Sequence, residues 1–239
     1  MHINCLVINV ASNVKRRLMV SEMLKLSGIQ FEIMPAVTLD TVTLPNLGNM
    51  NSTAVAVWQS HLNCLNKSAQ NDDYMLILED DAIIEFDGAY LARVILNMRT
   101  YDIDFLQLGY LKLNGFEYCS ILIRNLYSFF VSRGLFAQLF SWLGLAEVRR
   151  VKNQKWLRLI PRNYVLNDIR YGAHCYVVSP SFSRKVLKLN DPPFLAADDL
   201  YVSLSKMKSF KMFRLSKSLS RQGSYVSSFV KRYGIEERD

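Results

Sequence analysis

The sequence contains few cysteines and no long apolar run. Its four cysteines, among 239 residues, do not pair at the spacing of a zinc site. We therefore expect buried free thiols in a reducing compartment instead of a disulfide framework. No run of about 18 apolar residues occurs, so no membrane-spanning helix is expected. The first ten residues lack the basic start and the cleavage site of a signal peptide, so we expect a cytoplasmic protein.

Acidic residues are scarce in the second half of the chain. The net charge is +8, but residues 1–118 carry 8 basic and 13 acidic side chains, whereas residues 119–239 carry 21 basic and 8 acidic ones. The two parts therefore have charges of −5 and +13. A strongly basic surface indicates an anionic partner, and nucleic acid, anionic lipid and a phosphorylated substrate all fit.

Apolar segments with strand periodicity alternate with segments of helical periodicity. The pattern predicts strands over residues 3–9, 31–34, 74–78, 104–109 and 171–178, and helices over residues 14–28, 52–69, 87–98, 181–189 and 197–206. Half of the residues are apolar, which is enough for a large core. Alternation of this kind predicts an α/β fold with a mainly parallel sheet covered by helices.

One segment differs in composition from the rest. Residues 119–146 contain no acidic residue and are dense in Leu, Ile, Phe, Tyr and Trp. They form either a buried helical hairpin or an amphipathic element on an anionic membrane. We predict an apolar helical insertion around 119–148, within an amphipathic or acceptor-side insertion over 119–165 of a single domain that spans 1–239. The membrane alternative would place the protein peripherally at the inner face of the membrane.

Three adjacent carboxylates follow the predicted strand at 74–78. Glu79, Asp80 and Asp81 directly succeed four apolar residues. Crowding three negative charges costs free energy unless a cation compensates them, and hard divalent cations prefer carboxylate oxygens. The alternative is a solvated turn or a helix cap. If the strand geometry continues, Glu79 and Asp81 face one side and Asp80 the other. Asp81 is our first choice as a metal ligand, with Glu79 and Asp80 as the other candidates.

Four segments, in chain order, resemble glycosyltransferase family 25, which includes lipooligosaccharide and collagen galactosyltransferases. The similar segments are residues 7–9 (VIN) with 15–17 (KRR), residues 58–62 (WQSHL), residues 76–81 (LILEDD) and residues 172–178 (GAHCYVV). The Leu-Glu-Asp-Asp motif is the most specific of them. Weaker similarity is found at residues 197–199 (ADD) and 221–222 (RQ).

This resemblance implies a GT-A-like fold, a UDP-sugar donor, a manganese or magnesium ion, and inversion at the anomeric carbon. It also implies a glycan acceptor such as lipooligosaccharide, with galactose as the favoured sugar. The implied donor-binding residues are Asn9, Arg16, Arg17, His61, Glu79, Asp80, His174 and Gln222. Two alternatives stay open: both histidines are also typical of a packed core, and both arginines of a solvated helix face.

An inverting transfer needs a carboxylate that deprotonates the acceptor. That base must lie across the sugar from the metal, so a distant part of the chain should supply it. Asp198 and Asp199, at the start of a predicted helix, are the candidates, and Asp198 is slightly favoured. The alternative for this pair is simple helix capping.

Two other functions fit parts of the sequence. Lys and Arg residues between 206 and 221 interleave with Phe210, Phe213 and Tyr225, as in a surface that follows a nucleic-acid backbone. No glycine-rich phosphate loop or RNA-binding signature accompanies them, so nucleic acid is an unlikely partner. The second alternative is a GT-A-like scaffold that binds a nucleotide sugar without transferring it.

Overall fold

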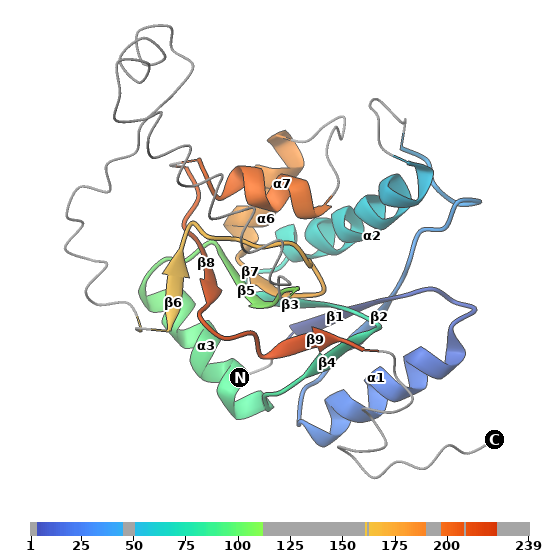
Figure 1. Ribbon diagram of the computed structural model, residues 1–239, viewed down its shortest axis with the longest axis horizontal. Coiled ribbons are helices and arrows are strands. Elements are labelled where there is room, and N and C mark those ends of the chain that lie inside the picture. The colour runs from blue at the N-terminus through green and yellow to red at the C-terminus, as the bar shows by residue number, and fades with distance from the viewer. Residues whose placement is uncertain are drawn as a thin grey trace, which may run out of the picture. The chain divides into compact units, whose positions relative to one another are not determined.

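The computed structural model describes residues 4–44, 51–111, 161, 163–189, 197–207 and 209–223 (Figure 1). Its strands are β1 Asn4–Asn9, β2 Glu32–Pro35, β3 Met75–Glu79, β4 Ala82–Ile84, β5 Phe105–Gly109, β6 Tyr164–Leu166, β7 Cys175–Val178, β8 Met212–Leu215 and β9 Ser220–Gln222. Its helices are α1 Val14–Leu26, α2 Ser52–Ala69, α3 Gly88–Thr100, α6 Pro180–Leu189 and α7 Ala197–Leu204. The predicted insertion at 119–148 lies outside the described residues, and the single-domain assignment stays a prediction.

All nine of these strands belong to one sheet, in which β2-β1-β3-β7-β5-β8-β6 is the main order. Strand β1 runs parallel to β2 and β3, and β5 runs parallel to β8 and β9. Strand β7 lies antiparallel between β3 and β5, so those two strands share one direction. Six strands (β1, β2, β3, β5, β8 and β9) therefore point the same way, which confirms the predicted mainly parallel sheet flanked by helices.

Several short strands were not expected from the sequence. Strands β4, β6, β8 and β9 have three or four residues each and are held by pairing with distant parts of the chain. The strand predicted over 171–178 begins only at Cys175. Gly172 has a φ of +103°, a left-handed value that interrupts an extended strand, which explains the late start.

Helices cover both faces of the sheet, with α2, α6 and α7 on one face and α1 and α3 on the other (Figure 1). Helix α2 begins where the side chain of Asn51 accepts a hydrogen bond from the N–H of Ala54 at 2.7 Å. Aromatic rings fill the space between the sheet and α2, α6 and α7. The Phe105 ring centroid lies 5.2 Å from that of Tyr176 and 5.0 Å from that of Tyr201. Each large apolar side chain removed from water contributes about 1.5–3 kcal/mol.

The three cysteines in the described ranges, Cys5, Cys64 and Cys175, are buried free thiols, as predicted. Burial raises the pKa of Cys64 to about 12, so this thiol stays protonated. Within the described ranges, no helix combines the length and the apolar character needed to cross a bilayer.

The basic segment after residue 200 does not present an aromatic stacking surface in its described part. Phe210 and Phe213 are buried in the core. The Arg214 guanidinium is also buried and pairs with Asp168, and Lys211 Nζ donates to Asp102 Oδ2 at 2.8 Å. Bases cannot stack on buried rings, so these contacts disfavour the nucleic-acid alternative.

A glycine in β5 allows close packing beside the candidate site. A Cβ at Gly109 would lie 2.5 Å from Nε2 of His174 and 2.7 Å from Cβ of Ser220. We expect Gly109→Ala to lower the free energy of unfolding by about 1–3 kcal/mol, because the buried neighbours must shift. Urea denaturation measures this change.

Gly28→Asn is the matched control, because a Cβ there meets no atom within 4 Å and asparagine tolerates the left-handed φ of +66°. An unfolding midpoint in Gly109→Ala equal to that of the parent protein would contradict the packing described here.

Candidate functional site

The polar residues gather where β1 and β3 end. The chain leaves β1 through α1 to β2 on one side, and it returns through α2 to β3 on the other side. The chain thus places β2 on one side of β1 and β3 on the other, so the space between β1 and β3 is a topological switch point. In α/β sheets, a crevice for ligands opens at the carboxyl ends of the strands at such a point. The register pairs Ile8 with Glu79, so Asn9 comes to lie beside Asp80.

Asp80 is buried and turns toward α1. Its carboxylate accepts a hydrogen bond from Asn9 Nδ2 at 2.7 Å and another from Arg16 Nη1 at 3.3 Å. Asn9 Nδ2 also donates to the backbone carbonyl of Asn13, 3.3 Å away, at the start of α1. These contacts tie the ends of β1 and β3 to the first turn of α1, with Asp80 as their common acceptor.

Of the three adjacent carboxylates, Asp81 has the fewest hydrogen-bond and ion-pair partners among the described residues. Its Oδ2 lies 3.9 Å from Arg16 Nη1, and its Oδ1 is buried with no hydrogen-bond partner in the described part of the chain. Burial and the charges of Glu79 and Asp80 raise the pKa of Asp81 to about 6, although Arg16 acts in the opposite direction. Strand β3 ends at Glu79, so the side alternation expected for a continued strand does not extend to Asp81.

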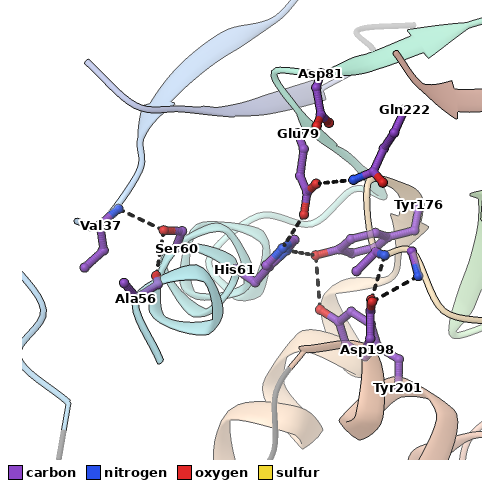
Figure 2. Close-up of polar contacts among 12 residues, drawn as sticks. Val37, Ala56, Ser60, His61, Glu79, Asp81, Tyr176, Asp198, Tyr201 and Gln222 are labelled. Atoms are coloured by element: carbon purple, nitrogen blue, oxygen red, sulfur yellow. Dashed lines mark hydrogen bonds and ion pairs between the residues drawn. The ribbon is translucent and has the colours of Figure 1, made fainter. Parts of the chain in front are cut away.

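Glu79 turns in the other direction, toward α2 and β9. Its Oε1 contacts His61 Nε2 at 3.2 Å, and its Oε2 accepts a hydrogen bond from Gln222 Nε2 at 3.1 Å (Figure 2). Burial disfavours the charged carboxylate, but the hydrogen bond with His61, assisted by His174 and Gln222, holds the pKa of Glu79 below its ordinary value. Glu79 is thus an ionised acceptor with defined partners.

The two predicted histidines differ in their contacts. His61 is buried and uses both ring nitrogens, because Nδ1 lies 2.8 Å from the hydroxyl of Tyr176 and Nε2 contacts Glu79. His174 is fully buried, and neither of its ring nitrogens has a hydrogen-bond partner among the described residues. Its backbone carbonyl accepts from the N–H of Glu79 at 3.0 Å, and burial lowers the pKa of its ring.

The two acidic residues at the start of α7, Asp198 and Asp199, differ in burial and in their contacts. The oxygens of Asp198 accept hydrogen bonds from the backbone N–H groups of Gly172 at 3.0 Å and Ala173 at 2.7 Å (Figure 2). Burial raises the pKa of Asp198, although these N–H groups act to lower it. Asp199 is exposed.

The remaining predicted donor-site residues, Arg17 and Gln222, make fewer polar contacts. Arg17 is half-buried on α1, and its side chain makes no polar contact within the described ranges. Gln222 is exposed apart from its hydrogen bond to Glu79. The structure therefore brings together Asn9, Arg16, His61, Glu79, Asp80, Asp81 and Gln222. His174 lies directly before β7, and Asp198, on α7, holds the backbone two residues before His174 and that of its neighbour Ala173.

The predicted metal ligands do not converge as a preformed cluster. No set of three or more His, Cys, Asp and Glu side chains in the described part of the chain has the arrangement of a metal site. Glu79 contacts His61 and Gln222 on the side of α2 and β9. Arg16 compensates part of the charge of Asp80 and Asp81. The Oδ1 of Asp81, which has no hydrogen-bond partner among the described residues and experiences the charges of Glu79 and Asp80, is the feature that fits a hard cation.

Two residues at the site were not predicted from the sequence. The hydroxyls of Tyr176 and Tyr201 lie 3.0 Å apart, and that of Tyr176 contacts His61. A buried tyrosine usually finds a polar partner, so Tyr176 within an apolar strand was the available signal.

Comparison with known proteins defines the class of this protein. The model of glycosyltransferase family 25, described as an LPS biosynthesis protein, matches residues 2–201. The chain therefore is a glycosyltransferase and belongs to family 25, which confirms the resemblance noted in its motifs. One similar solved structure is the crystal structure of an active-site mutant of LgtC, with a TM-score of 0.43 and 11% identity over 88% of this chain and 72% of that chain. No curated protein matches.

The raised pKa of Asp81 predicts a pH-dependent stability. The folded protein binds the Asp81 proton up to about pH 6, whereas the unfolded chain releases it near the ordinary value of 3.8. Stability therefore falls as the pH rises through this window, and the charged carboxylate costs free energy above it. We expect Asp81→Asn, with chelator present, to raise the free energy of unfolding at pH 7.5 by about 2 kcal/mol.

Urea denaturation at pH 7.5 and pH 4.5 measures this gain, which should shrink at the lower pH. Asp72→Asn removes an exposed carboxylate at the other end of β3 and serves as the control. An equal gain at both pH values would contradict the expectation.

Proposed function

We propose that the protein transfers a hexose, with galactose favoured, from a UDP-sugar to a lipopolysaccharide or lipooligosaccharide acceptor with inversion at the anomeric carbon. The observation that carries the proposal is the crowding of Glu79, Asp80 and Asp81 at the ends of β1 and β3, where a nucleotide is expected to bind. The membership of family 25 supports transfer to a glycan as the reaction class.

In this proposal Asp80 and Asp81 hold a manganese or magnesium ion. One oxygen of Asp81 has no partner in the described ranges, and this oxygen and the like charge of Glu79 and Asp80 favour a cation there. A bound cation would supply charge neutralisation for a departing diphosphate. Arg16, beside both carboxylates, adds a permanent positive charge at the same strand ends.

Glu79 and Gln222 bind hydroxyl groups of the donor. Glu79 is ionised and fixed by His61, so it is oriented to accept hydrogen bonds from sugar or ribose hydroxyls. Gln222 is exposed and offers an amide beside it. Asn9 orients Asp80, and we assign the half-buried Arg17 and the buried His174 to the lining of the same site.

Asp198 is the proposed general base. The acceptor hydroxyl oxygen bonds to the anomeric carbon as the bond from that carbon to the phosphate oxygen breaks. The hydroxyl proton passes to the carboxylate of Asp198, and UDP leaves with the bonding electron pair. The raised pKa of Asp198 suits proton uptake near neutral pH.

The surplus of basic residues after residue 118 fits an anionic acceptor. A phosphorylated glycolipid and the anionic membrane that contains it attract the same positive surface. We propose that this charge keeps the enzyme close to the inner face of the membrane.

A donor screen tests the reaction and its metal dependence. UDP release is measured for each UDP-hexose with a lipooligosaccharide acceptor, with manganese and with chelator. We expect turnover only with the cation, and a loss of at least about 100-fold in Asp81→Asn. Asp72→Asn should keep the parent rate. Binding of UDP with manganese but no turnover with any donor would favour a non-catalytic scaffold.

A comparison of two variants tests the base. We expect Asp198→Asn to lower kcat by about 10²–10⁴-fold with little change in donor affinity, because an amide cannot take up the acceptor proton and keeps one of the two acceptors that hold Gly172 and Ala173. Asp199→Asn, on the neighbouring exposed residue, should keep most of the activity. Single-turnover rates and calorimetric UDP binding measure the two effects. A larger loss in Asp199→Asn would transfer the role to Asp199.

A further inference from the structure

A line of hydrogen bonds runs from Glu79 into the aromatic core. Glu79 Oε1 lies 3.2 Å from His61 Nε2, and His61 Nδ1 lies 2.8 Å from the hydroxyl of Tyr176. The Tyr201 hydroxyl donates to that of Tyr176 at 3.0 Å (Figure 2). The four residues come from β3, α2, β7 and α7, so the line joins four elements across the core.

The interior members of this line are shielded from water. His61, Tyr176 and Tyr201 are each about 1% exposed or less. Burial raises the pKa of both tyrosines above the ordinary value, so each hydroxyl keeps its hydrogen. An unsatisfied hydrogen here costs about 1–3 kcal/mol, so the network strongly restricts where each hydrogen points.

The direction of each hydrogen bond in the line determines the direction of the next. Tyr201 donates to the oxygen of Tyr176, so the hydrogen of Tyr176 needs another acceptor. Among the described residues, His61 Nδ1 is the acceptor that contacts this hydroxyl. The ring hydrogen of His61 therefore sits on Nε2 and points at Glu79. The opposite tautomer would leave the Tyr176 hydrogen without an acceptor and would set a nitrogen lone pair against the Glu79 carboxylate.

We propose that Tyr176 and Tyr201 are positioning residues that fix His61 as the Nε2–H tautomer and thereby orient Glu79 toward the donor. The inference rests on the proposed role of Glu79 in donor binding. Tyr201 also lies one helical turn after Asp198 on α7, so the helix that carries the proposed base is joined to the carboxylate that receives the donor.

The tautomer is measured directly by ¹⁵N NMR of histidine-labelled protein, assigned with His61→Gln. We expect the His61 signals of the parent protein to show hydrogen on Nε2 and none on Nδ1. Tyr176→Phe should weaken this preference, because the Glu79 carboxylate then acts alone, and Tyr201→Phe should weaken it less, because Tyr176 still donates but is no longer required to do so. Hydrogen on Nδ1 in the parent protein would overturn the inference.

The control is Tyr74→Phe, which also removes one partly buried tyrosine hydrogen bond, to the carbonyl of Met98, at the opposite end of β3. This variant should leave the His61 signals unchanged. A change equal to that in Tyr176→Phe would mean that any lost hydroxyl disturbs the ring, which overturns the assignment.

Kinetics test the positioning role. We expect Tyr176→Phe to raise the KM for the UDP-sugar about ten-fold while the KM for the acceptor changes little, and Tyr74→Phe to change neither. Unchanged donor KM in Tyr176→Phe, with an altered tautomer, would overturn the positioning role. If the parent protein releases no UDP from any donor, the proposed function fails, and the NMR spectra still decide the tautomer.

Discussion

The parallel pairing of β1 with β3 is the contact on which the site depends. It sets Asn9 beside Asp80 and brings the acidic residues of one strand end next to the start of α1. The resulting concentration of negative charge is unfavourable by itself. The fold reduces the cost by sending the carboxylates to different partners: Asp80 to Asn9 and Arg16, and Glu79 to His61 and Gln222. Within the part of the chain that the structure describes, one oxygen of Asp81 has no such partner.

The contacts of Glu79 and Asp198 link the candidate site to the core. Glu79 contacts His61, and the other ring nitrogen of His61 contacts the hydroxyl of Tyr176. The orientation of the Glu79 carboxylate is therefore determined by buried residues that no substrate reaches. Asp198 likewise holds the backbone that leads into β7. Packing and polar geometry are thus not separable here, because the rings that fill the space under the sheet also orient the groups at its edge.

Elements with a strong local pattern were predictable from the sequence, and elements defined by pairing were not. Helix α2 has the predicted bounds, because a cap at Asn51 and a long apolar face both identify it. Strand β9 has three residues and exists through its pairing with β4 and β5, which no local pattern encodes. The same holds at the site. Glu79, Asp80 and Asp81 are adjacent in sequence, whereas the partner of His61, Tyr176, is 115 residues away.

The reversed direction of β7 has a consequence for how the turn before it is anchored. This strand delivers its first residues, and not its last, to the edge at which β1 and β3 end. His174 is therefore held in place by the strand on its carboxyl side, through the ladders that β7 forms with β3 and β5. The chain just before Gly172 is held by a separate set of contacts, in which the side chain of Gln107 hydrogen-bonds the backbone of Arg170 and β6 pairs with β8. The turn that carries His174 and the two N–H partners of Asp198 is therefore fixed at both ends, so a change in its length would displace either the sheet ladder behind it or the contacts in front of it.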